Sequence, residues 1–426
     1  MKNKFSLILF VISVLYMPAL YAQENTLDSL IQRAVSVSPE IKMLERKFDA
    51  AEDKVPQVSN LPDPMLTLGL MNLPTNSFSF TQEPMTGKVV GLSQAIPFPG
   101  KLGAMEKVTA KDADIVKQEI NDQKNNVIKN VKKDYYELTF TRKAIDIAKE
   151  TKLLLNNILD VVKTKYTVSQ TSQQNLIKVE LEITNINDKI TELKGKETAQ
   201  LATLNSILLL PADSQIKTDD KINPKFLDLS KIGLDSMARA NRPFLKGLDI
   251  AKEKAGLMQD AAKYDYYPNF NIAFQYSFRD HIAKTNTPLD NFFSAVIGIS
   301  LPLNYGGKVD AKVEEADAME NMYKEQYAAS MQKLNTNFSS SVAKLNTIKD
   351  RVKLINEGLL PQAKQNLTTA LASYQVGEVD FINVIDAQSK LYQIETNLYR
   401  LETDYVKEVA DLEFLTGVNL SGYEIK

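Results

Sequence analysis

The chain has no cysteine and only one histidine among its 426 residues. Without cysteine it can form no disulfide and carry no lipid on an N-terminal cysteine, so attachment to a membrane has to come from the fold. The same shortage leaves no Cys/His pair and no Ser/His/Asp set for nucleophilic catalysis. His281 lies in a polar stretch between two candidate strands, where a solvated surface residue is expected. We therefore expect a protein that is not an enzyme and has no cofactor.

The chain also has no large excess of positive or negative charge. The 51 basic residues nearly balance the 53 acidic ones, which leaves a net charge of −2 at pH 7. A chain with this balance presents no broad basic surface, so we expect no nucleic acid among its partners.

The first residues have the pattern of an export signal. Lys2 and Lys4 precede an apolar run from Phe5 to Met17, and small residues up to Ala22 follow it. The run is shorter than the roughly 20 residues that a membrane-spanning helix needs. We predict a signal peptide over residues 1–22 that is removed before Gln23.

The rest of the chain contains an internal duplication. The apolar seam of residues 179–193 recurs 208 residues later at 387–401, and Tyr166-Thr-Val-Ser recurs as Tyr374-Gln-Val-Gly. Upstream, Ser38-Pro39 matches Arg242-Pro243 at an offset of 204. A drifting offset of this size indicates two homologous halves rather than a short-period solenoid.

Each half contains two stretches of strand-like alternation. In the second half, the apolar side chains of one stretch alternate strictly with polar or small ones. These five side chains, which we predict to face lipid, are Phe270, Ile272, Phe274, Tyr276 and Phe278. The length and alternation of the four stretches match transmembrane β-strands, although half-buried hairpins of a soluble protein would show the same pattern. In lipid, four strands with two unpaired edges would have to close with other copies of the chain.

Long helices follow the strands. No proline interrupts residues 102–166, so one helix there would extend about 95 Å at 1.5 Å per residue. Apolar residues at spacings of four and three predict coiled-coil seams. We predict a first repeat at 23–210, which consists of a helix, a β-hairpin at about 65–97 and a helical hairpin at about 101–210. A linker follows at 211–230. The second repeat, at 231–420, consists of a helix, a β-hairpin at about 269–302 and a helical hairpin at about 308–417, and a tail covers 421–426.

Two motifs have alternative interpretations. Pro99-Gly100-Lys101 and Gly306-Gly307-Lys308 resemble phosphate loops only superficially, because Leu or Val follows the lysine where Ser or Thr is required; a tight strand-to-helix reversal is the better interpretation. Met65, Met71 and Met85 carry thioethers that would suit a soft cation, but methionine also fills apolar contacts without specificity. We expect no resident metal site.

The order of elements and the repeated Tyr-x-Val-Gly tip, followed by Asn383-Val-Ile-Asp386, resemble the TolC-like outer-membrane factor family over the whole mature chain. The resemblance implies an α+β membrane protein: a trimeric α-helical barrel continued by a 12-stranded transmembrane β-barrel, with four strands per protomer. It implies an outer-membrane efflux channel of a Gram-negative bacterium, with a periplasmic tunnel.

The resemblance also implies functional positions. Val168, Ser169, Val376 and Gly377 at the helix tips would contact a periplasmic adaptor, and Asp386, Asn383, Tyr374 and Asn175 would form the channel aperture. Asn383 and Asn175 stand where carboxylates can occur in the family, and Val379 where an arginine can. A charged clasp of the family's form is therefore not carried over to this chain.

Gly69-Leu-Met-Asn-Leu-Pro74 and Gly91-Leu-Ser-Gln-Ala-Ile-Pro-Phe-Pro-Gly100 are similar to the heavy-metal branch of the family. The implied partners are a homotrimer of this chain, a periplasmic adaptor (membrane fusion protein), an inner-membrane efflux pump of the resistance-nodulation-division type, and outer-membrane lipid. The alternative hypothesis is an exported periplasmic coiled-coil adaptor or scaffold protein without a channel.

Overall fold

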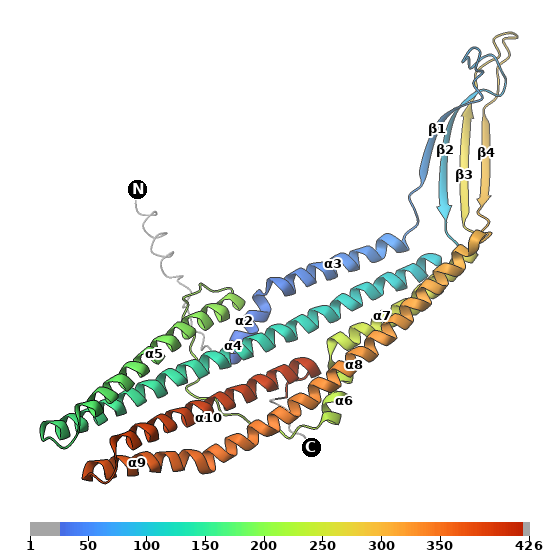
Figure 1. The fold of residues 1–426 in the computed structure, drawn as a ribbon. Helices are drawn as coiled ribbons and strands as arrows, with labels where there is room; N and C mark the ends of the chain where they lie inside the picture. Colours follow the sequence, from blue (N-terminus) through green and yellow to red (C-terminus); the bar gives the residue numbers. More distant parts are fainter. Residues whose placement is uncertain (1–25, 421–426) are drawn as a thin grey trace, which may run out of the picture.

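The computed structural model describes residues 26–420. The predicted signal peptide at 1–22 and the predicted tail at 421–426 lie outside these residues. The described chain is elongated: a long helical body carries a β-sheet at one end (Figure 1). The helices and strands of the first half are α2 (Leu27–Val37), α3 (Pro39–Ser59), β1 (Met65–Met71), β2 (Gly87–Ile96), α4 (Lys101–Thr167) and α5 (Gln173–Ile207). Those of the second half are α6 (Lys231–Asn241), α7 (Pro243–Lys263), β3 (Phe270–Phe278), β4 (Phe292–Ile299), α8 (Lys308–Leu354), α9 (Leu360–Val376) and α10 (Phe381–Thr416).

The entry helices of the two halves break at the same place. The Ser38 side chain accepts a hydrogen bond from the backbone N–H of Ile41 at 3.4 Å, and Pro39 occupies the first turn of α3. Pro243 opens α7 in the same way after α6. Proline fits the first turn because its missing N–H would have no helical partner there. Pro39 and Pro243 therefore mark the boundary between the two entry helices of each half.

The four strands form one antiparallel sheet in the order β1-β2-β3-β4. The β2–β3 pair joins the two halves of the chain: Lys88 lies opposite Phe278 and Ile96 opposite Phe270. Each repeat therefore supplies one hairpin, and the sheet is continuous across the repeat boundary.

The helical hairpins of the two repeats lie side by side, but their first helices differ (Figure 1). α4 runs unbroken for 67 residues. α8 instead leads into a π-helical segment at Ile355–Leu359, which continues as α9 with Pro361 in its first turn. Proline cannot donate to the carbonyl four residues before it, and a π turn is one way to accommodate that loss.

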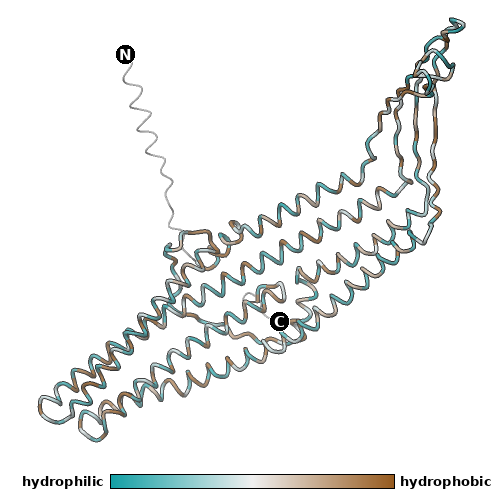
Figure 2. Tube along the Cα trace, turned by 45° about the horizontal axis from the view of Figure 1, so that its top comes forward, coloured by the Kyte–Doolittle hydropathy of each residue, from teal (hydrophilic) through white to brown (hydrophobic). Residues whose placement is uncertain are grey.

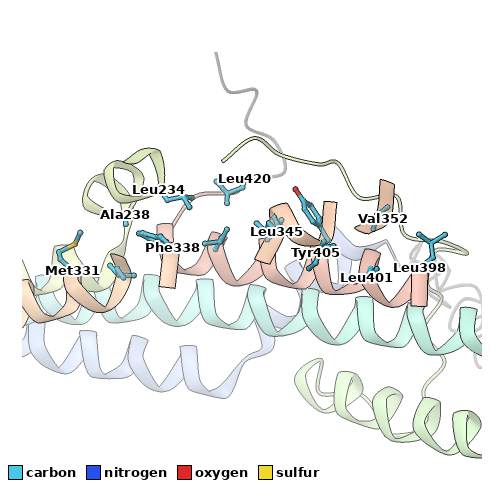
Figure 3. Packing of buried hydrophobic residues seen from close by; sticks show 14 of the residues in the cluster. Leu234, Ala238, Met331, Phe338, Leu345, Val352, Leu398, Leu401, Tyr405 and Leu420 are labelled. Atoms are coloured by element: carbon cyan, nitrogen blue, oxygen red, sulfur yellow. The ribbon is translucent and has the colours of Figure 1, made fainter. Parts of the chain in front are cut away.

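Apolar residues are distributed along the helices in narrow stripes. Figure 2 shows teal and brown alternating along every helix of the body. Within residues 26–420, no helix combines the length and the apolarity needed to cross a membrane. The stripes instead pack helix against helix, as in the cluster of Figure 3, where Phe338 of α8 and Tyr405 of α10 are fully buried.

The segment between the repeats is fixed to both of them by tyrosine hydroxyls. Tyr135 of α4 accepts a hydrogen bond from the backbone N–H of Asp219 at 3.0 Å, and Tyr405 of α10 accepts one from that of Leu227 at 2.7 Å. Ile216 and Ile222 of the same segment are buried. The linker is therefore anchored to the middle of the body at these points, while most of its residues are exposed.

Candidate functional site

The sheet has one face that is apolar across its whole width. Residues directly opposite one another in an antiparallel sheet share a face, so the register defines rows of side chains. The two central rows are Leu66, Leu92, Phe274 and Ala295, and Leu68, Val90, Tyr276 and Phe293. The rings of Phe274 and Phe293 stack with their centroids 6.1 Å apart. These side chains are uncovered in the single chain, where Phe293 is 67% exposed.

The opposite face is more mixed: it carries polar and small residues in its central row, with Met65, Val89, Phe292 and Val296 in the flanking rows. The corresponding central row consists of Thr67, Gly91, Gln275 and Ser294. Polar side chains on the apolar face are confined to its ends: Lys88 pairs with Asp280 at 3.4 Å near one end, and Gln94 donates to the carbonyl of Pro62 near the other. Apart from the Tyr276 hydroxyl, which accepts a hydrogen bond from Asn291 at 3.1 Å, the middle of the apolar face of the described sheet carries no polar side-chain group.

Both outer edges of the sheet are open. In the part of the chain that the structure describes, β1 pairs with β2 alone and β4 with β3 alone. Each open edge presents a row of backbone N–H and C=O groups that favour pairing with another strand.

The three methionines of the first hairpin do not converge. Met65 and Met71 begin and end β1, so they lie about 20 Å apart at 3.3 Å per residue. One ion cannot bind both thioethers. Among residues 26–420, the structure also contains no cluster of three His, Cys, Asp or Glu side chains that could hold a metal.

At the far end of the body, both helical hairpins turn through the same backbone motif. Ser169 and Gly377, which correspond at the offset of 208, have φ of 61° and 83°. In each turn, the next residue donates its N–H to the carbonyl five residues back, from Gln170 to Lys165 and from Glu378 to Ser373. This is the Schellman ending of a helix, which favours glycine because a side chain is strained at positive φ.

We therefore expect Ser169→Gly to stabilise the first turn by about 0.5–1 kcal/mol, and Gly377→Ala to destabilise the second by a similar amount. No heavy atom lies within 4 Å of a Cβ built at Gly377, so the cost there is conformational rather than steric. Hydrogen exchange of the tip amides measures both effects. Opposite signs at the two positions are required; two destabilising substitutions would contradict the assignment.

Two of the predicted aperture residues, Tyr374 and Asn175, are linked through Thr171. The Tyr374 hydroxyl lies 3.3 Å from Thr171 Oγ1, to which Asn175 donates a hydrogen bond at 2.9 Å. The Tyr374 ring packs edge-on against Phe381 at 5.3 Å and is only 5% exposed. Tyr374 therefore links the hairpins and is not a surface residue in the single chain.

The other two predicted aperture residues lie elsewhere. Asn383 and Asp386 are three residues apart on one exposed face of α10. No hydrogen bond joins them to Tyr374 or Asn175 among the described residues. The tip residues Val168, Ser169, Val376 and Gly377 are all exposed.

An ion network in the middle of the body was not predicted from the sequence. Glu137 of α4 accepts two hydrogen bonds from the Arg400 guanidinium of α10, at 2.7 and 2.8 Å, and one from Lys407 at 2.5 Å. Arg400 also pairs with Asp404 and lies over the ring of Phe140 at 4.4 Å. The Arg400 and Lys407 hydrogen bonds outweigh the effect of burial and lower the pKa of Glu137 to about 2.

Further ion pairs extend this contact between the repeats. Lys133 binds Asp411 at 2.8 Å, and Lys132 binds Glu413 at 2.5 Å. The available signal was the spacing of charges along α10, where Arg400, Asp404, Lys407 and Asp411 alternate in sign every three or four residues. This spacing places them on one helix face. From the sequence alone, a charged face of this kind is expected to be exposed to solvent, because the partner helix α4 cannot be identified.

Comparison with known proteins relates the chain to one family. The family model for "Outer membrane efflux protein" matches residues 234–418, from α6 to just beyond α10. The multidrug resistance outer membrane protein MdtP of Escherichia coli O6:H1 is 21% identical over 88% of this chain and 81% of that protein. The cation efflux system protein CusC of Escherichia coli K12 is 21% identical over 68% of this chain and 64% of that protein.

Solved structures share the fold over nearly the whole chain. A crystal structure of CusC, described as showing conformational changes on folding and transmembrane channel formation, superposes with a TM-score of 0.75, 17% identity and coverage of 93% of both chains. The outer membrane protein VceC of Vibrio cholerae superposes with the same TM-score at 15% identity, over 92% of this chain and 96% of that chain. At this coverage the similarity extends over both repeats.

Proposed function

We propose that this chain, a member of the outer membrane efflux protein family, is the exit duct of a tripartite efflux system in the outer membrane of a Gram-negative bacterium. It conducts cargo passively from a periplasmic adaptor and an inner-membrane pump to the exterior. The same family resemblance supports a pump of the resistance-nodulation-division type. The proposed active form is a homotrimer.

The observation that carries this proposal is the apolar sheet face with two open edges. A lipid bilayer offers no hydrogen bonds to an open edge, so a sheet that faces lipid has to close. Pairing β4 of one copy with β1 of the next would satisfy both edges, and three copies would make a barrel of twelve strands. The apolar face would then meet lipid, and the Thr67–Gln275 face would line the lumen.

The helical hairpins support a tunnel below the barrel. Two hairpins per chain, packed side by side, give a trimer six hairpins, enough to form a closed wall. Their tips expose Val168 and Val376, two apolar residues on rigid turns. Exposed apolar side chains on a fixed turn suit contact with another protein, and we propose that the adaptor binds here.

The competing hypothesis is an exported adaptor or scaffold without a channel. Such a protein would have to leave the apolar face of its sheet in water, because no other element of the described chain covers it. It would also be extracted from cells without detergent. A duct requires detergent for extraction, so this simple comparison separates the two hypotheses.

For the cargo we propose cations, including heavy-metal cations. CusC is named for cation efflux and MdtP for multidrug resistance, so relatives alone leave two kinds of cargo. Exposed Asp386 favours the first: three copies would place three carboxylates near the tunnel axis, where restricted hydration strengthens their attraction for cations. Tyr374 and Asn175 would hold the hairpins around this ring.

Asp386→Asn is expected to lower the cation selectivity of trimers reconstituted in planar bilayers and to weaken block by multivalent cations. Removing three converging carboxylates removes the field that concentrates cations at the constriction. Glu378→Gln, an equally exposed carboxylate at the tip, is the matched control and should change both properties less. Unchanged conductance, selectivity and block in Asp386→Asn would exclude this residue from the constriction.

A further inference from the structure

The two strand-to-helix elbows of the chain differ in a way that the repeat does not require. The first elbow, residues 97–100, packs its one large apolar side chain, Phe98, against protein, although Pro99 and Gly100 are exposed. The Phe98 ring stacks on Tyr267 with centroids 4.5 Å apart. Gly100 lies so close to Tyr264 that an added Cβ would come within 2.9 Å of its hydroxyl oxygen.

The second elbow, residues 301–307, carries three apolar side chains that protein does not cover. Leu301 is 73% exposed, Leu303 60% and Tyr305 83%. A stretch of chain rarely exposes successive large apolar side chains in this way without a partner surface.

Side-chain hydrogen bonds hold the backbone of this elbow in a tight turn. Asn304, which has a positive φ of 45°, accepts a hydrogen bond from the backbone N–H of Val309 at 2.8 Å and donates one to Asp310 at 2.9 Å. The hydroxyl of Tyr266 donates to the other oxygen of the same carboxylate. The exposed side chains are therefore presented on a hydrogen-bonded turn.

The position of the elbow identifies the partner surface. It continues directly from β4, whose exposed residues Phe293, Ile297 and Ile299 belong to the apolar face of the sheet. The 8 residues of β4 span about 23 Å at 3.3 Å per residue, close to the roughly 25 Å apolar band of a transmembrane barrel. The residues after β4 therefore come level with the lipid head groups on the side of the helical body.

We infer that Leu301, Leu303 and Tyr305 insert into the head-group region of the inner leaflet of the outer membrane and anchor the trimer there. This inference rests on the proposed membrane-spanning sheet. A tyrosine with an apolar ring and a polar hydroxyl suits the boundary between hydrocarbon and water. The chain has no cysteine to carry a lipid. In this inference, the three side chains set the depth of the helical body relative to the membrane.

The absence of tryptophan from the natural sequence makes a direct test possible. Leu303→Trp and Tyr305→Trp each introduce a single fluorophore at an exposed position, where no packing is disturbed. Trimers of each variant are reconstituted into phosphatidylcholine vesicles whose acyl chains are brominated either near the head group or near the methyl end. Both variants should lose most of their emission with the shallow bromines and less with the deep ones.

Two control variants separate this inference from the proposed function. Phe274→Trp, in the middle of the apolar face, should be quenched most by the deep bromines. Ile232→Trp, at an 83% exposed position of α6, should be quenched by aqueous iodide alone. If Phe274→Trp responds to bromine but both elbow variants do not, the elbow faces water or a second copy of the chain, and the inference is overturned. If Phe274→Trp is also insensitive, the sheet is not in the bilayer, and the proposed function fails.

Discussion

Phe274→Arg should prevent most of the protein from assembling in the outer membrane. Phe274 lies at the centre of β3, in the middle of the apolar face. A cation at the bilayer midplane costs about 2–4 kcal/mol per copy, which amounts to about 6–12 kcal/mol for a trimer if the copies add. The measurement is the fraction of assembled oligomer in outer-membrane preparations.

Gln275→Arg is the matched control because it introduces the same side chain one residue further, at nearly the same depth. Gln275 lies on the polar face with Thr67 and Ser294, so its substitution should leave assembly close to the natural level. Equal losses from the two substitutions would contradict the assignment of the apolar face to lipid and of the opposite face to the lumen.

Glu137→Gln should destabilise the contact between the two repeats by about 2 kcal/mol per chain. The lowered pKa of Glu137 corresponds to roughly 3 kcal/mol between its charged and neutral forms, and the 25% exposure of its side chain reduces this figure. The variant leaves Arg400 and Lys407 without their shared carboxylate. The shift in the midpoint of chemical unfolding in detergent measures the loss.

The pH dependence gives this prediction its sign. Because the folded-state pKa of Glu137 lies below the value of about 4.3 for an unfolded chain, its stabilisation is fully present above pH 5. It is lost as the pH falls toward 2, where the natural chain and the variant should become equally stable. Burial raises the pKa of Glu402 to about 7, and taking the difference between chain and variant removes that separate contribution.

Glu192→Gln provides the control for this network. Two lysines of its own helix, Lys189 and Lys196, also lower the pKa of Glu192 to about 2, but this carboxylate is on the surface. Exposed pairs contribute little because water and salt screen them. If Glu192→Gln and Glu137→Gln had equal effects, burial between the repeats would not be what strengthens the network.

The sequence predicted best those elements whose two faces meet different surroundings. Alternation identified the strand at Phe270–Phe278 because its apolar and polar side chains segregate by register. The two tips were also predicted, because Tyr166-Thr-Val-Ser corresponds to Tyr374-Gln-Val-Gly in the sequence. In the structure, Ser169 has a positive φ, as Gly377 does, although the residue type differs. Both cases depend on local patterns that survive in a single chain.

Features that depend on the partner element were not visible. Tyr374 matched a family position at the aperture, but its burial against Phe381 follows from how the hairpins pack. Glu137 and Arg400 look in the sequence like residues of solvent-exposed helix faces. They are each other's partners, but they lie in different repeats, 263 residues apart. The π-helical segment at Ile355–Leu359 had no periodicity of its own to reveal it.

The most direct test of the central claim is the mass of the detergent-extracted assembly, determined by native mass spectrometry on material from the outer-membrane fraction. The proposed duct predicts three copies of the mature chain, because only closure with other copies satisfies the open edges of β1 and β4. A monomer that is stable in buffer without detergent would contradict it.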